Sequence, residues 1–146
     1  MDYIALKKTT TDLLQELKNT AHIEDYFKEN RECLRANNFL EELERLYRLQ
    51  GRKKAEIARE SAISEIYLYQ IFAGKRIPTR DRLVCICLGM HLYEEDAQHL
   101  LRLCGHSPLY ARDKRDAVLL HGLMHRTPVG EVNGLLIENG CDALLG

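Results

Sequence analysis

The sequence contains no tryptophan, only three prolines and only nine glycines among its 146 residues. So few chain-breaking residues leave little room for a disordered chain, or for an all-β fold with its many turns. No apolar run approaches the roughly 18 residues that a membrane-spanning helix needs. The first residues, Met1–Ile4, also lack the basic and then apolar layout of a signal peptide. We therefore expect a cytoplasmic protein with no membrane partner.

The chain as a whole also lacks a surplus of positive charge, since its formal net charge is −1. Nucleic-acid-binding proteins usually carry such a surplus. In this chain the positive surplus is confined to one stretch, from Gly51 to Arg82, which we call the basic segment. This segment contains eight cations and four acids. The segment is therefore +4 and the rest of the chain −5. The cations are Arg52, Lys53, Lys54, Arg59, Lys75, Arg76, Arg80 and Arg82. We interpret the segment as a candidate DNA surface; the alternative is a solvated charged face.

Signatures of catalysis and of metal binding are missing as well. His121 and His125 have the spacing of two ligands on one helix face, but two ligands are too few for zinc and no HExxH glutamate accompanies them. In a helix, the side chains of Cys85 and Cys87 diverge by about 200°, which argues against a redox pair. The five cysteines are expected to be reduced, and Cys85, Cys87 and Cys104 to be core residues. We expect no metal, no cofactor and no enzymatic activity.

What the chain does contain favours helices, because Leu, Glu, Lys, Arg and Ala dominate it. Apolar residues recur at helical spacing between cap and break residues throughout the chain. The predicted helices run from Thr11 to Leu17, from His22 to Leu34, from a cap at Asn38 to Gly51, from Lys54 to Ser61, from Glu65 to Phe72, from a cap at Thr79 to Met90, from Glu94 to Cys104, from Asp113 to His125, and from a cap at Thr127 with Pro128 first in the helix to Glu138. The predicted fold class is all-α.

The two short helices in the basic segment carry the functional signal. Ile57 and Ala58 are apolar and small enough for a close helix crossing, and Ile63 fills the turn between the helices. Ser64 is a good cap for the second helix, which Leu68 and Ile71 anchor to the core. Its other face is left pointing outward, with Glu65, Ile66, Tyr69 and Gln70. A helix held in this way can enter a DNA major groove.

This block resembles the XRE (Cro-like, phage-repressor-type) helix-turn-helix family. The resemblance rests on Ile57-Ala58, Ile63-Ser64, Leu68, Ile71, Gly74-Lys75-Arg76-x-Pro78 and the helix containing Leu83, and it covers about residues 39–103. Segments 100–105, 108–117 and 131–136 look like an extended bacterial subgroup that has a further C-terminal helical pair. The resemblance implies a five-helix, lambda-repressor-like core at 37–107. An N-terminal helical extension at 1–36 and the helical pair at 108–146 would flank that core.

The resemblance further implies a sequence-specific transcriptional regulator that binds double-stranded DNA, as a homodimer formed through the N- or the C-terminal helices. The base-reading positions would be Ser64, Glu65, Ile66, Tyr69 and Gln70. The phosphate-binding positions would be Arg52, Lys54, Lys75, Arg76 and Arg80.

Several residues depart from the family pattern. Lys53 stands where a Ser or Thr cap is common, Glu65 would repel phosphates, and His91 replaces a usual Gly at a helix end that favours positive φ. The aromatic pair Tyr67 and Tyr69 also suits contact with a protein. The alternative function is therefore a protein–protein adaptor that keeps the fold without binding DNA. Its partner would be another protein, contacted in part through the terminal helices.

Overall fold

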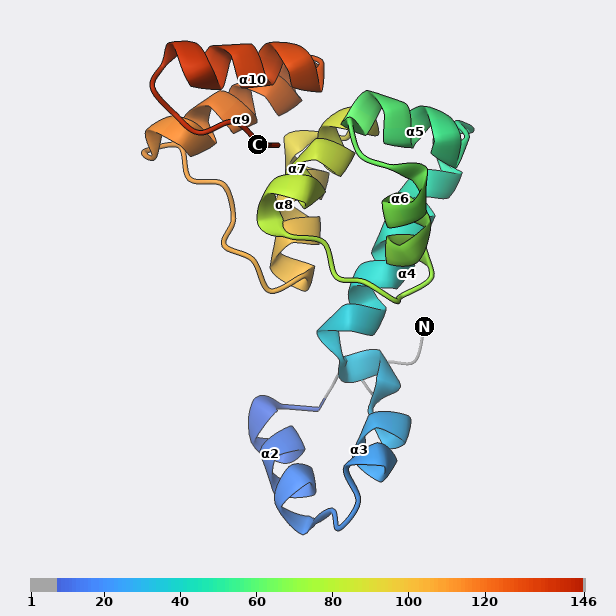
Figure 1. Ribbon diagram of the computed structural model, residues 1–146. Coiled ribbons are helices and arrows are strands. Elements are labelled where there is room, and N and C mark those ends of the chain that lie inside the picture. Colours follow the sequence, from blue (N-terminus) through green and yellow to red (C-terminus); the bar gives the residue numbers. More distant parts are fainter. Residues whose placement is uncertain (1–7, 146) are drawn as a thin grey trace.

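The computed structural model describes residues 8–145, without the side chains of residues 35–37. The prediction drawn from Met1–Ile4 lies outside this range. Every regular element within it is a helix (Figure 1), which confirms the predicted all-α class. No helix among these residues is both long and apolar enough to cross a membrane.

The N-terminal part consists of two short helices and one helical turn. Helix α2 spans Thr10–Asn19, α3 spans Ile23–Glu29, and the 3₁₀ turn η1 spans Arg31–Cys33. The cap of α2 is Thr9 rather than Thr11, in a reciprocal capping box with Asp12. The predicted single helix from His22 to Leu34 is wrong, because it breaks at the buried Asn30. The backbone N–H and the side-chain amide of Asn30 both donate to the Tyr26 carbonyl, and the backbone of Asn30 leaves helical geometry with φ −117° and ψ 27°.

Helices α4 (Arg35–Arg48), α5 (Lys54–Ser61) and α6 (Glu65–Phe72) follow. Helix α4 begins three residues before Asn38, whose backbone N–H already bonds the Leu34 carbonyl, so the predicted cap at Asn38 is wrong. The bounds of α5 and α6 match the prediction residue for residue. Their short length is set by the left-handed Ala62 after α5, with φ 58°, and by Gly74 after α6, with φ 76°.

Helix α7 (Arg80–Gly89) is the centre of the core, and every residue from Leu83 to Gly89 is buried. Helix α5 crosses it so closely that a Cβ on Gly89 would lie 2.0 Å from Ser61 Oγ and 2.7 Å from Ser61 N. Helix α8 (Glu94–Leu103) packs on both α4 and α7. This arrangement brings α4 to α8 around one apolar interior.

Helices α9 (Lys114–Met124) and α10 (Val129–Glu138) pack on each other and on α7. Leu119, Val132 and Leu136 join the same core as α7. Asp113 caps α9 through the Asp116 N–H, whereas α10 starts after Pro128 rather than with it. Figure 1 shows this pair at one end of the molecule, while α2 and α3 project from the start of α4 at the other.

Candidate nucleic-acid interface

Buried apolar side chains hold α5, α6 and the turn between them against the core. Ile57, Leu68 and Ile71 are fully buried. The turn is closed by the Ile63 N–H bonding the Ala58 carbonyl at 3.1 Å. Ser64 Oγ then accepts from the Tyr67 N–H at 3.1 Å and caps α6. Helix α6 is therefore rigidly placed, with one side in the core and the other in solvent.

The solvent side of α6 carries the predicted base-reading residues, and we call it the α6 face: Ser64, Glu65, Ile66, Tyr69 and Gln70. Ile66 is 71% exposed and Tyr69 49% exposed, Ser64 and Glu65 are exposed, and Gln70 is half-buried. The structure thus brings all five to one face. Their chemistry is mixed: a hydroxyl used as a cap, a carboxylate, an aliphatic side chain, a phenol and an amide.

Three of the predicted phosphate-binding cations border the α6 face. Lys54 Nζ lies over the rings of Phe72, Tyr47 and Tyr69, at 4.7, 5.0 and 5.7 Å from their centroids. These cation–π contacts hold the first residue of α5 beside α6. Lys75 follows the end of α6 and is exposed.

Arg76 is the third of these cations. Its Nε donates to Gln70 Oε1 at 2.9 Å. Its guanidinium lies 5.2 Å from the Tyr67 ring centroid. Arg76 is thereby tied to α6 at two points while its charge stays exposed to solvent.

The other two predicted cations, Arg52 and Arg80, are engaged inside the fold. Arg52 Nη1 donates to the Gly89 carbonyl at 2.8 Å, and the guanidinium pairs with Glu56 and Glu60. Arg80 makes two 2.9 Å bonds to Asp116 and further bonds to two backbone carbonyls. The bonds to Asp116 raise the pKa of Arg80 and fasten it to α9. We therefore leave both residues out of the candidate interface.

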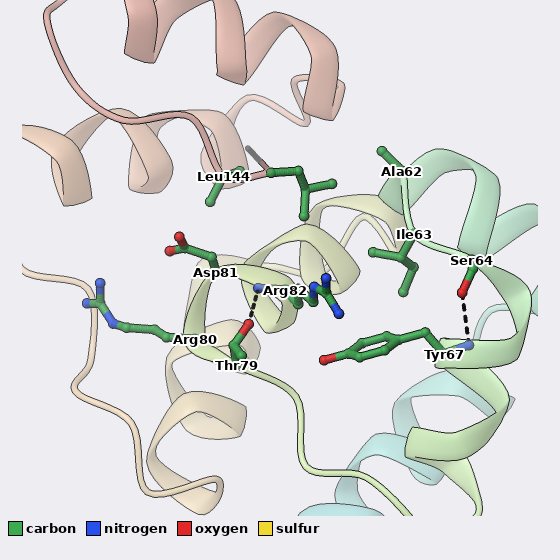
Figure 2. Close-up of a pocket in the computed structure, with 10 residues that line it drawn as sticks. Ala62, Ile63, Ser64, Tyr67, Thr79, Arg80, Asp81, Arg82 and Leu144 are labelled. Atoms are coloured by element: carbon green, nitrogen blue, oxygen red, sulfur yellow. Dashed lines mark hydrogen bonds between the residues drawn. The ribbon is translucent and has the colours of Figure 1, made fainter.

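Arg82 is a further cation of the basic segment, which was not among the predicted phosphate-binding positions. It is exposed, and its guanidinium lies 4.6 Å from the Tyr67 ring centroid. Figure 2 shows Tyr67 and Arg82 in a groove between the start of α6, the start of α7 and the C-terminal segment at Leu144. The groove has a volume of about 770 Å³. Arg80 and Arg82 stand two positions apart, so a helix points them in different directions. The sequence gives no sign of which one faces the core.

The cysteine and histidine candidates show no catalytic geometry among the described residues. Cys85 is buried, and burial raises the pKa of its thiol to about 12. The rings of His121 and His125 lie 4.2 Å apart on the exposed side of α9. Residues 8–145 contain no group of three or more His, Cys, Asp or Glu side chains placed to hold a metal ion.

The arrangement is thus a short, exposed and rigidly held helix bordered by Lys54, Lys75, Arg76 and Arg82. Comparison of the chain with protein-family models, with curated proteins and with solved structures gave no match. The resemblance to the XRE family stays a prediction from the sequence. The α6 face and the cations around it are therefore the features that bear on the function.

Proposed function

We propose that the protein is a sequence-specific DNA-binding regulator of transcription that inserts α6 into the major groove. One observation carries the proposal: the α6 face is exposed except at the half-buried Gln70 while Leu68 and Ile71 hold α6 in the core, and four cations border that face. A helix with its side chains is about 10–12 Å wide, which fits a major groove about 12 Å wide.

The residues around α6 divide into two roles. Lys54, Lys75, Arg76 and Arg82 are placed to neutralise phosphates, a contact that gives affinity without sequence information. On the α6 face, the Gln70 amide suits adenine and the Ile66 side chain suits a thymine methyl. The Glu65 carboxylate accepts hydrogen bonds and suits the amino group of cytosine, while it disfavours the acceptor edge of guanine. We therefore expect the protein's preference for one DNA sequence to come from few base contacts.

A homodimer fits this function because two copies read two half-sites one helical turn apart. The N-terminal helices are the better candidates for the dimer contact, because α2 and α3 expose four apolar side chains: Leu14, Leu17, Ile23 and Phe27. The C-terminal pair, by contrast, buries Leu119, Val132 and Leu136 against the core of its own chain. We therefore place the proposed contact between copies at the α2–α3 hairpin.

A second candidate function is favoured by the composition of the α6 face. Ile66 and Tyr69 are the largest exposed side chains there, and their only charged neighbour on this face is Glu65. Exposed aliphatic and aromatic side chains of this kind are typical of the centre of a protein–protein contact. The adaptor function would use the same face with a protein in place of DNA.

The experiment that tests the DNA proposal is a fluorescence-anisotropy titration with duplex DNA from the gene's own upstream region at two salt concentrations. The affinity should fall steeply as the salt concentration rises, because bound cations release counterions from the DNA. The double variant Lys75→Glu with Arg76→Glu should lose binding and keep its helical circular dichroism. The matched control is Arg102→Glu with Arg112→Glu, which reverses two exposed charges outside α5, α6 and α7, in α8 and before α9, and should retain most of the affinity. No sequence-dependent binding at low salt would overturn the proposal.

A further inference from the structure

The groove of Figure 2, which we call the Tyr67 groove, has three walls. The first consists of residues 62–64 and Tyr67, the second of residues 79–82 at the start of α7, and the third of Leu144 and Leu145. Its volume of about 770 Å³ lies within the range of about 300–1,000 Å³ that is usual for small-molecule sites. The groove is therefore large enough for a small molecule rather than for a single ion alone.

The Tyr67 side chain brings an unsatisfied polar group to this groove. Tyr67 is only 8% exposed, and its hydroxyl has no hydrogen-bond partner among residues 8–145. Figure 2 shows the side chain reaching from α6 toward the start of α7, with the hydroxyl at its tip in the groove. A tyrosine hydroxyl usually has a hydrogen-bond partner when its ring is buried. The free hydroxyl therefore indicates that the groove receives a group that can bond it.

Arg82 enters the same groove from the opposite wall. Its guanidinium lies 4.6 Å from the centroid of the Tyr67 ring, and no carboxylate pairs with it among the described residues. The other charged residues of the lining, Arg80 and Asp81, are each bound to a counter-ion on α9. The Tyr67 contact thus holds an unneutralised positive charge in the groove.

The starts of two helices add to the positive potential there. Ser64 and Thr79, the cap residues of α6 and α7, both line the groove. Helix N-termini carry partial positive charge and favour anions, phosphate groups among them. Arg76 brings a second guanidinium to the same Tyr67 ring, at 5.2 Å from its centroid. The groove therefore favours an anionic ligand.

We propose that the Tyr67 groove binds a small organic phosphate, with its phosphate group between Arg82 and the Tyr67 hydroxyl. The two donors come from opposite walls, and the three terminal oxygens of a phosphate monoester point in different directions and can accept from both. A planar carboxylate is less suited to donors on two sides. Ile63 and Leu145 are half-buried and offer hydrocarbon surface to the organic part of the ligand. This apolar surface favours a compact organic phosphate over a DNA phosphate.

Binding in this groove would regulate the proposed DNA interface, a step that rests on the proposed function. Arg82 borders the α6 face, where it is placed to neutralise a DNA phosphate. A phosphate ester on Arg82 takes up that charge and puts negative charge beside α6. The ligand and DNA therefore weaken each other's binding, by the same factor in both directions.

The test is a titration of the free, full-length protein, labelled at its methyl groups for NMR, with phenyl phosphate as the probe. Phenol keeps the ring, inorganic phosphate keeps the charge, and benzoate replaces the phosphate group by a planar carboxylate. We expect saturable shifts at the Ile63, Leu144 and Leu145 methyls. The Kd for phenyl phosphate should be about tenfold or more below that of each comparison compound.

Two variants locate the phosphate group. Arg82→Gln, which changes an exposed side chain, should raise the Kd for phenyl phosphate to that of phenol. Tyr67→Phe keeps the buried ring and removes only the hydroxyl, so it should raise the Kd about fivefold. The matched controls are Arg59→Gln and Tyr93→Phe, on exposed residues outside the lining, and they should leave the Kd unchanged.

The outcomes separate this inference from the DNA proposal, because the titration contains no DNA. Phenol, inorganic phosphate or benzoate binding as tightly as phenyl phosphate, or shifts confined to methyls elsewhere, overturns the organic-phosphate site even if DNA binds. Shifts at the three methyls that only duplex DNA produces assign the groove to the DNA backbone and also overturn it. Saturable binding that Arg82→Gln abolishes supports the site even if DNA does not bind. If DNA binds and saturating phenyl phosphate leaves the Kd for DNA unchanged, the regulatory step is overturned.

Discussion

Two reciprocal ion pairs join α7 and α9. Each helix contributes one arginine and the aspartate that follows it in the sequence. Arg80 binds Asp116 with two bonds of 2.9 Å, and Arg115 binds Asp81 with bonds of 2.9 and 3.0 Å. Arg115 also donates to the backbone carbonyls of Asp142 and Ala143, and so holds the C-terminal segment beside the groove of Figure 2. Four side chains thereby join the C-terminal pair to the helix at the centre of the core.

Asp116→Asn should lower the free energy of unfolding by about 2–3 kcal/mol. Asp116 is only 7% exposed, and its loss leaves the partly buried Arg80 without its counter-charge, which is costly inside a protein. Urea denaturation measures the change. The matched control is Glu44→Gln, which breaks an exposed ion pair with Arg48 and should cost less than about 0.5 kcal/mol. Equal effects of the two variants would contradict this account.

The same carboxyl group predicts a dependence of stability on pH. Burial alone would raise the pKa of Asp116, but hydrogen bonds from Arg80 and the Tyr110 N–H, with the nearby positive charges, hold that pKa below its usual value overall. The unfolded chain then takes up this proton at a higher pH than the folded chain does. The contribution of Asp116 is therefore complete above about pH 5 and is lost as the pH falls through the lowered pKa. The difference in stability between the wild type and Asp116→Asn should shrink in acid denaturation series below pH 4.

At the residue scale, the sequence predicted the α6 face but not the state of every cation around it. Glu65, Ile66 and Tyr69 are exposed as expected, because Leu68 and Ile71 determine which side of α6 is buried. Arg52 pairs with the nearby Glu56 and Glu60, but the Gly89 carbonyl that it also bonds lies 37 residues away along the chain, and the Asp116 that binds Arg80 lies 36 residues away. Local periodicity carries no information about contacts at such distances.

At the scale of elements, helix bounds were predictable where local residues set them. Ser64 caps α6 and Gly74 ends it, and both signals can be read within a few residues. The break between α3 and η1 was not predictable in this way. Asn30 is fixed in part by Lys8 Nζ, which donates to its Oδ1 at 2.6 Å from 22 residues away. A cap acts locally, whereas this break depends on a contact that exists only in the folded chain.

Helix α5 lacks a capping side chain, so a substitution that supplies one should stabilise the protein. Its cap residue is Lys53, in an extended conformation with φ −80° and ψ 149° and without a side-chain cap bond. Lys53→Ser should raise the free energy of unfolding by about 1 kcal/mol, because a serine there accepts from an unpaired N–H. Glu56 already stands at the third helical position, where it would complete a capping box with the new serine. Lys53→Ala, which removes the same charge without adding a cap, should show no such gain in thermal unfolding.

The crossing of α5 and α7 predicts that Gly89→Ala is strongly destabilising, by about 3 kcal/mol. The added Cβ would overlap the side chain of Ser61 and also its backbone, at 2.7 Å from N and 2.9 Å from Cα. Ser61→Ala in the same chain should therefore not restore stability. Gly134→Ala in α10 is the matched control: a Cβ there meets nothing within 4 Å, so this variant should gain about 0.5–1 kcal/mol. Chemical denaturation of the three variants decides the point.

At the scale of the whole molecule, burial is distributed unevenly. Helix α7 is buried from Leu83 onward, whereas no residue of α2 is buried and α3 buries Tyr26 alone. The sequence predicted helices in both regions because each has apolar residues at helical spacing. Which region would form the core depended on long-range packing, to which the α2–α3 hairpin contributes little. The molecule therefore combines a well-packed body with an outlying hairpin whose apolar side chains remain exposed (Figure 1).

This uneven burial predicts the pattern of amide hydrogen exchange. Amides of α7 should exchange only through global unfolding, while those of α2 and α3 should exchange much faster through local opening, because few buried contacts hold them. If the hairpin is the contact between two copies, its protection should rise with protein concentration, and so should that of α7, because association of the native state also opposes global unfolding. The double variant Leu14→Glu with Phe27→Glu should remove both rises and leave the exchange of α7 at low protein concentration unchanged. Hairpin protection that is independent of concentration, with a monomer by light scattering at every concentration, would exclude the α2–α3 dimer.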